Sequence, residues 1–226
     1  MEKKLQTKEA QYQVVLETAE KIGLEKLGLS ASESYYQDPK HLLFRFARYK
    51  FVAKMLTGKP EVLEIGCGDT FGARIVQAEV GNLTGFDFDP VFISDAESRM
   101  LDKWRFNVFV HDLLEGPPPG KYDAFYSLDV LEHISSSNED LFLKNAVSAL
   151  TSNGIGIIGS PSLESQQYAS IQSKLGHVNC KSAEELKTLM EKYFHNVFMF
   201  SMNDEVVHTG FQKMAHYLIA IGVGTK

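Results

Sequence analysis

A glycine-rich turn and the acidic residues downstream of it are the groups best suited to bind a ligand. Gly66 and Gly68 follow a short apolar run, and Asp87 ends the next apolar run, 19 residues beyond Gly68. Glycines in a strand-to-helix turn let a ligand approach backbone N–H groups, and a carboxylate at the next strand end can accept hydrogen bonds from both ribose hydroxyls. Asp112 follows a third apolar run, where it can accept from an adenine amino group. This spacing predicts a nucleoside ligand.

Each of these signals has a simpler explanation when it stands alone. A glycine turn can be a tight connection without a ligand, and an acid at a strand end can be the N-cap of the following helix. Three such groups at successive strand ends are harder to explain by capping. A nicotinamide dinucleotide is the alternative ligand, but the third glycine of its turn would fall one position before Gly72.

A second group of reactive side chains follows the fourth apolar run. Asp129, Glu132 and His133 stand at positions i, i+3 and i+4, so one helical turn would place two carboxylates and an imidazole on one face. We expect this face, with His177, to position an acceptor or remove its proton without a metal. In that interpretation His133 and His177 are catalytic and Asp129 contacts the substrate. A divalent metal ion held by all four residues is the alternative.

The polar segment at residues 203–210 lies between the last two apolar runs and is expected near the ligand edge of the sheet. Glu205 and His208 in this segment are further catalytic candidates, because they can bind or deprotonate an acceptor. A solvated turn is the alternative.

Residues 40–60 hold six basic residues and no acid. This charge favours a small anionic substrate, and we expect Arg45, Arg48 and Tyr49 to contact it. The alternative is a solvated helix face.

The elements that must position these groups follow an α/β pattern. Short apolar runs at residues 62–65, 83–86, 106–110, 124–128 and 155–158 alternate with amphipathic segments, which predicts a parallel sheet with crossover helices. Capping-box patterns at Ser136 with Glu139 and at Ser182 with Glu185 mark two helix starts. Two more strands are expected at residues 197–201 and 217–221. The prediction is a doubly wound, mostly parallel sheet of seven strands.

The domain organisation is expected to be a helical cap at residues 1–58 and a ligand-binding domain at residues 59–226. A helical face in the cap is predicted from Leu43, Ala47, Phe51 and Met55, which recur every fourth residue.

Composition narrows the class of protein. The chain has 226 residues, of which 44% are hydrophobic and 23% charged, as expected of a folded domain. Its net charge of −6 disfavours nucleic acid as a partner. Two cysteines, no apolar leader and no long apolar run indicate a cytoplasmic protein without membrane insertion. The expected partner is a small-molecule substrate.

The sequence resembles the class I S-adenosylmethionine-dependent methyltransferases, which have a Rossmann-like fold. The resemblance spans residues 61–161 and rests on the glycine turn, the acids at the strand ends and the segment at residues 127–134, SLDVLEHI. It implies S-adenosylmethionine as cofactor, S-adenosylhomocysteine as product, and the following cofactor-binding residues: Glu64, Gly66, Cys67, Gly68, Asp87, Phe88, Asp112, Leu113 and Leu128.

The resemblance also suggests an activity. Residues 176–221 look like the small-molecule branch that includes ubiquinone-biosynthesis enzymes, and Asp129 stands where the metal-binding members of related branches carry Glu. We expect in-line O- or N-methylation of a small polar acceptor, such as a sugar, nucleotide-sugar or phosphorylated metabolite. A non-catalytic cofactor-binding regulator or partner protein is the alternative, and an NAD-dependent oxidoreductase is a further one.

Overall fold

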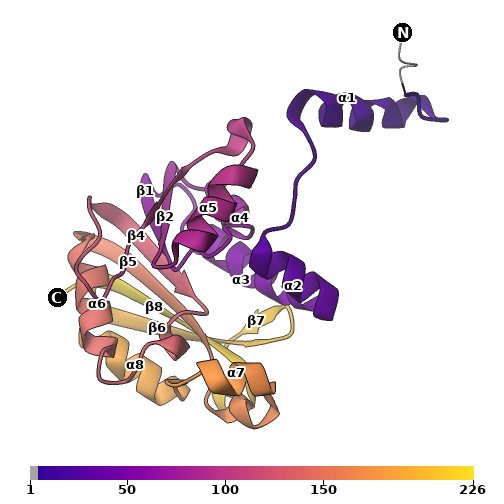
Figure 1. Ribbon diagram of the computed structural model, residues 1–226. Helices are drawn as coiled ribbons and strands as arrows, with labels where there is room; N and C mark the ends of the chain where they lie inside the picture. Colours follow the sequence, from indigo (N-terminus) through magenta and orange to yellow (C-terminus); the bar gives the residue numbers. More distant parts are fainter. Residues whose placement is uncertain (1–4) are drawn as a thin grey trace.

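An eight-stranded sheet forms the centre of the protein in the computed structural model, which describes residues 5–226 (Figure 1). The strand order is β3-β2-β1-β4-β5-β8-β6-β7. The strands are β1 (Glu61–Ile65), β2 (Asn82–Asp87), β3 (Asn107–Val110), β4 (Tyr122–Leu128), β5 (Leu150–Pro161), β6 (Phe194–Asn203), β7 (Val206–His208) and β8 (Tyr217–Thr225).

The first five strands are parallel, whereas β8 runs antiparallel to both β5 and β6. The chain winds outward from β1 in both directions, so the carboxyl ends of β1 and β4 meet at a topological switch point, where α/β folds bind ligands. The sequence prediction of seven strands is one short. The short run at Val206–His208 pairs with the end of β6, so the expected polar loop contains β7.

Helices cover both faces of the sheet. The helices after β1 are α4 (Ala73–Gln77), α5 (Pro90–Arg99), α6 (Glu139–Ser148), α7 (Ile171–Gly176) and α8 (Ala183–Glu191). Short 3-10 turns are η1 (Ala10–Tyr12), η2 (Asp102–Trp104), η3 (Leu131–His133), η4 (Glu164–Tyr168) and η5 (Gln212–Met214). No helix within residues 5–226 combines the length and apolarity needed to cross a membrane.

The two predicted capping boxes have different outcomes. Ser182 and Glu185 form both hydrogen bonds of the box at the start of α8, which confirms that prediction. The box at Ser136 is wrong, because α6 begins at Glu139 with Asn138 as its N-cap. Ser136 therefore lies outside the first turn and cannot reach its N–H groups.

Three helices precede the sheet: α1 (Gln13–Ile22), α2 (Leu29–Gln37) and α3 (Lys40–Met55). The first stands apart from the body in Figure 1 and buries none of its residues. The predicted packing face of α3 is wrong at its ends, since Leu43 is 58% and Met55 43% exposed. The buried face instead contains Tyr49 and Val52, which pack against the sheet.

The hydrophobic core lies in two layers, one on each face of the sheet. Alternate residues of one strand enter opposite layers, so Leu63 packs with the layer under α6 and α8 while Val62 packs with the layer under α3 and α4. Apolar side chains therefore cover both faces of the central strands, as is typical of parallel sheets. This packing holds the strand ends that carry the acids in place.

Candidate active site

A cavity of about 620 Å³ opens at the carboxyl ends of the central strands, beside α2 and α3. Its volume is in the range of small-molecule sites. Of the predicted site residues, the following line it: Arg45, Tyr49, Gly66, Cys67, Gly68, Asp87, Phe88, Asp112, Leu128, Asp129 and His133. Glu64, Arg48, Leu113, His177, Glu205 and His208 are not on its wall.

The glycine turn has the backbone conformation that its sequence suggested. Gly66 and Gly68 have φ angles of +72° and +48°, in the left-handed region that favours glycine. A Cβ on Gly66 would collide with the side chain of Val130, whereas Gly68 has open space where its Cβ would be. The turn therefore exposes main chain to the cavity.

Two carboxylates are fixed next to this turn. Asp87 accepts hydrogen bonds from the N–H groups of Gly68 and Asp89, at 2.9 and 3.0 Å. Asp112 accepts a 2.8 Å hydrogen bond from the N–H of Leu114. Local backbone donors thus orient both acids at neighbouring strand ends, in the arrangement expected of a nucleoside site.

Glu64 lies just behind the cavity wall. It is 1% exposed, and its Oε1 accepts a 2.8 Å hydrogen bond from the hydroxyl of Tyr49. Its Oε2 is buried with no hydrogen-bond partner among the described residues. Burial raises the pKa of Glu64 to about 8, although the Tyr49 hydrogen bond opposes this shift.

Sequence reasoning missed several residues of the cavity wall. One of them, Asp69, accepts a 2.6 Å hydrogen bond from the N–H of Ala31 at the start of α2. Gly28 leaves room for this contact, because a Cβ there would collide with Asp69. The position of Asp69, directly after Gly68 of the glycine turn, is the sequence signal from which its place on the cavity wall could have been predicted. The missed residues are Ser30, Asp69, Gly72, Phe92, Leu114, Val130 and Ile134.

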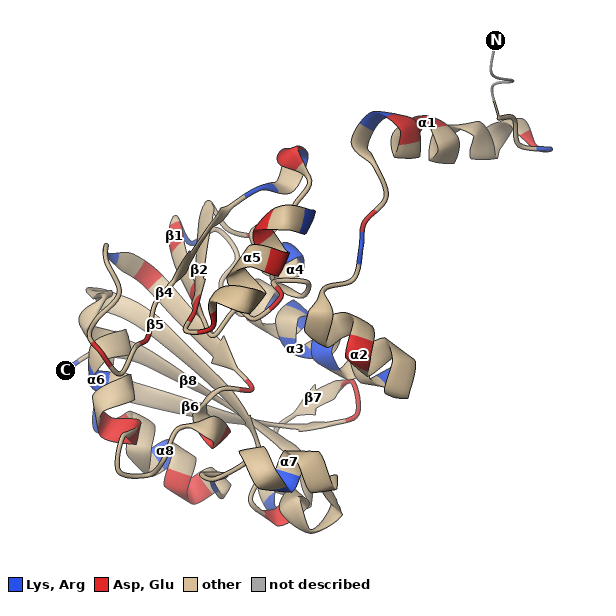
Figure 2. Ribbon diagram, viewed as in Figure 1, with Lys and Arg blue, Asp and Glu red and all other residues tan. Residues whose placement is uncertain are grey.

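The two arginines expected to contact substrate have different environments. The basic residues of α3 appear in blue beside the sheet in Figure 2. Arg45 donates hydrogen bonds to the hydroxyls of Ser30 and Ser34, and no ion pair among the described residues includes it. Arg48 does not line the cavity and is paired with Asp129. Among the described residues that line the cavity, Arg45 is the arginine or lysine that lacks an acidic partner.

The predicted acid and histidine face separates into two groups. The 3-10 turn begins at Leu131, so Asp129 lies before it, with a φ of +58°, and is not on a common face. Glu132 and His133 do meet His177, and one ligand atom from each lies within 4.8 Å of the others. These three side chains are the only group of this kind within residues 5–226.

The hydrogen bonds of the two imidazoles favour one tautomer of each neutral ring. Nδ1 of His133 lies 3.0 Å from the carbonyl oxygen of Gly176, and Nδ1 of His177 lies 2.9 Å from Oε1 of Gln166. Both oxygens can only accept, so each Nδ1 donates to its partner, and Nε2 of each neutral ring keeps a lone pair. Burial lowers the pKa of His177, and neighbouring His133 adds to the shift. The pair can accept a proton or hold a metal ion.

Three predicted residues lie elsewhere. Both ring nitrogens of His208 are used inside its own hairpin, by Asn203 and by the N–H of Gly210. Glu205 is exposed in the turn before β7, and Leu113 is buried in the core. The structure does not bring these residues to the cavity.

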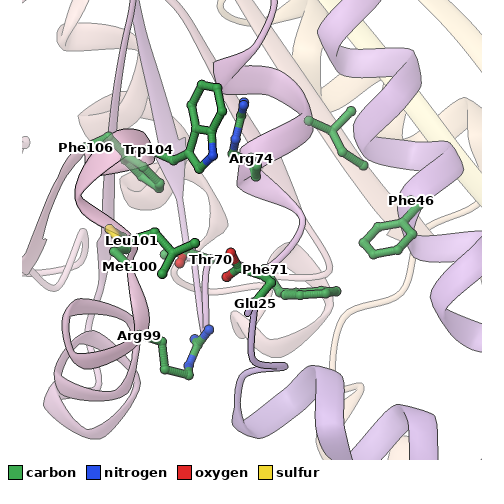
Figure 3. Close-up of a pocket in the computed structure, with 11 residues that line it drawn as sticks. Glu25, Phe46, Thr70, Phe71, Arg74, Arg99, Met100, Leu101, Trp104 and Phe106 are labelled. Atoms are coloured by element: carbon green, nitrogen blue, oxygen red, sulfur yellow. The ribbon is translucent and has the colours of Figure 1, made fainter. Parts of the chain in front are cut away.

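A second cavity of about 340 Å³ is lined by residues that follow the glycine turn, such as Thr70 and Phe71, and by residues 99–101, 104 and 106 (Figure 3). Arg74 stacks on Trp104, with its guanidinium carbon 3.6 Å from the ring centre. No predicted site residue lines this cavity.

Comparisons with known proteins find similarity to methyltransferases. A family model described as a methyltransferase domain matches residues 62–154. A probable S-adenosylmethionine-dependent methyltransferase of Mycobacterium tuberculosis is 25% identical over 114 residues, which make up 50% of this chain and 39% of that protein. The chain therefore matches only about two fifths of the length of its curated relatives.

Solved structures show the same fold. One is the N-methyltransferase NodS from Bradyrhizobium japonicum, solved in complex with S-adenosyl-L-homocysteine. It aligns with a TM-score of 0.58 at 18% identity, and the alignment covers 84% of this chain and 87% of the NodS chain. Another is a putative methyltransferase of Haloferax volcanii, solved with the Trm112 methyltransferase activator. It aligns with a TM-score of 0.66 at 14% identity, and the alignment covers 90% of this chain and 99% of that chain.

The fold is that of the class I S-adenosylmethionine-dependent methyltransferases. Residues 62–154 of this chain match the methyltransferase domain model, and the flanking elements complete the fold seen in the solved methyltransferases. The cavity fits the cofactor of that class. Open glycine backbone, two oriented carboxylates and the buried carboxyl of Glu64 are groups of the kinds that can bind an adenosyl amino acid.

Proposed function

We propose that the protein is an S-adenosylmethionine-dependent methyltransferase whose acceptor is a small, polar, anionic metabolite. The candidate acceptors are sugars, nucleotide-sugars and other phosphorylated metabolites. We infer an anionic acceptor from Arg45, which is half-buried on the cavity wall and has no acidic partner among the described residues. A buried charge needs compensation, and an anionic acceptor supplies it.

On the cofactor side, Asp87 would accept hydrogen bonds from the ribose, and Asp112 from the adenine amino group. Gly66, Cys67 and Gly68 would offer main-chain contacts, while Phe88 and Leu128 provide apolar surface. Glu64 would lie near the methionine amino end. The bound cofactor supplies an activated methyl group, and the protein's own contribution is to align the acceptor and exclude water.

On the acceptor side, His133 lies on the cavity wall with its Nε2 free to accept a proton. An alcohol acceptor needs such a base, whereas a neutral amine does not. His177 and Glu132 lie behind His133 and would position it. This arrangement favours acceptor positioning and proton removal without a metal. Residues 1–58 would act as a cap that contributes Arg45 and Tyr49.

The test is turnover. Purified protein is incubated with S-adenosylmethionine and a panel of sugar phosphates and nucleotide-sugars, and demethylated cofactor is measured. We expect turnover with at least one anionic acceptor and none with its neutral analogue. Cofactor binding by calorimetry with no turnover on any acceptor would favour the regulator or partner protein instead.

A further inference from the structure

The strongest feature that this function does not use is the ion pair between Arg48 and Asp129. Nη1 of Arg48 donates to both carboxylate oxygens of Asp129, at 2.8 and 2.7 Å. The guanidinium carbon lies 3.7 Å from the ring centre of Tyr217. The side chain of Arg48 is only 16% exposed, and its Nε is buried without a partner among the described residues. Stacking and burial hold this cation in place.

This cation stands beside the cluster that resembles a metal site. Glu132, His133 and His177 bring three ligand atoms together, and both imidazoles present a lone pair on Nε2. Three protein ligands satisfy some metal sites, but a hard divalent ion needs more carboxylate oxygen than one glutamate supplies. Asp129 is the nearest further carboxylate in the sequence, and Arg48 already occupies both of its oxygens.

The electrostatics connect the two groups. The charges of Asp129 and Arg48 both act on the carboxyl of Glu132, Asp129 unfavourably and Arg48 favourably, so the ion pair lies close to the cluster. A divalent ion that used Asp129 as a ligand would have to displace the guanidinium of Arg48 from it.

We propose that Arg48 is a built-in cation that takes the place of a divalent metal ion beside Asp129 and keeps this corner of the site metal-free. Arg48 is a positioning residue in this view, since it holds Asp129 and does not line the cavity. Its removal would leave an uncompensated carboxylate next to three potential ligands, and that combination would bind a divalent ion.

The experiment measures Mn²⁺ binding by electron paramagnetic resonance of the free ion, and Zn²⁺ binding by competition with a chromogenic chelator. The proteins are the wild type, Arg48→Gln, Arg48→Met and Arg48→Lys. We expect at least tenfold tighter Mn²⁺ binding by the Gln and Met variants than by the wild type. Arg48→Lys keeps the charge and should remain close to the wild type. Adding His177→Ala to Arg48→Gln should abolish the gain.

One result would overturn the proposal: equal metal affinity in the wild type and in Arg48→Gln, when the variant still unfolds cooperatively and binds S-adenosylhomocysteine. It would mean that Arg48 does not exclude the ion. Arg48→Met preserves apolar contact with Tyr217, so it serves if Arg48→Gln does not fold. The inference rests on the proposed site, but metal binding is read without methyl transfer, so failure of one is distinguishable from failure of the other.

Discussion

The hydroxyl of Tyr49 on α3 donates a 2.8 Å hydrogen bond to Glu64 on β1, so a buried acid joins the helical cap to the strand that precedes the glycine turn. Burial raises the pKa of Glu64 to about 8, and this carboxyl is mainly protonated near neutral pH. An ammonium group placed beside it would favour the ionised form. Cofactor binding and proton release should therefore be coupled.

The first prediction concerns that coupling. Binding of S-adenosylmethionine at pH 7 should release up to about one proton in the wild type, since the folded apo protein holds a proton that the complex does not need. Titration calorimetry in buffers of different ionisation enthalpy measures this number. Glu64→Gln should abolish the release, and Tyr49→Phe, which keeps the acid, should retain it. Binding without proton exchange in the wild type would contradict the role given to Glu64.

A second prediction is the pH dependence of stability. Because the folded pKa of Glu64 is above its ordinary value of 4.5, the folded chain binds more protons than the unfolded chain between pH 4.5 and about 8. The free energy of unfolding of the apo protein should therefore fall as pH rises through this window. Urea unfolding at several pH values measures it, and Glu64→Gln should flatten the curve. Glu132 contributes with the same sign, so an unchanged slope in Glu64→Gln would assign the whole effect to other groups.

For the ribose acid, Asp87→Ala should cost about 1 to 3 kcal/mol of cofactor affinity, the range for losing charged hydrogen bonds in a desolvated site. Calorimetry with S-adenosylhomocysteine measures the loss. Asp89→Ala is a matched control, because Asp89 caps α5 through the N–H of Val91 and is not on the cavity wall. Undiminished affinity in Asp87→Ala, or tighter binding of NAD than of the adenosyl cofactor, would disprove the assignment.

The fourth prediction tests the acceptor charge. Arg45→Ala should raise the KM of an anionic acceptor, more strongly at low salt, while cofactor affinity changes little. Arg45→Lys should recover part of the loss. Arg74→Ala removes an arginine from the second cavity and should leave the KM unchanged. Equal losses for cofactor and acceptor in Arg45→Ala would show that this arginine is structural.

The last prediction concerns the proton acceptor. His133→Ala should reduce kcat about 10²-fold with a hydroxyl acceptor, while S-adenosylhomocysteine binding is kept. Activity should also survive dialysis against a chelator. Loss of activity on chelation that Mg²⁺, Mn²⁺ or Zn²⁺ restores would refute the metal-free mechanism, and a fully active His133→Ala would refute any catalytic role for this imidazole.

Local patterns were sufficient to predict much of the fold and many of the residues that line the cavity. The glycine turn and the strand-end acids depend on short-range spacing, and the parallel sheet brings equivalent strand ends to one edge whatever the details of packing. Asp87 and Asp112 therefore lie where spacing placed them. The seven-strand prediction failed only at β7, a three-residue strand with too short a pattern to recognise.

The acceptor side depended on contacts between residues distant in sequence. Spacing of i, i+3 and i+4 assumes a helix that starts at Asp129, but the chain turns through a left-handed φ there and begins a 3-10 turn two residues later. Nothing in the sequence shows that Arg48 reaches Asp129, 81 positions away. His208 was a plausible base by type alone, and its hairpin uses both ring nitrogens.

The contact between Asp69 and the start of α2 has a consequence for how the chain divides. Ala31 gives its N–H to an acid of the glycine loop, and Tyr49 gives its hydroxyl to Glu64, so segments on either side of residue 58 share buried polar partners. A fragment starting at residue 59 would leave both acids without these donors, at the cost of unsatisfied buried groups. Helices α2 and α3 should therefore melt with the sheet in one cooperative transition, and the boundary at residue 58 would divide the sequence without separating two independently stable units.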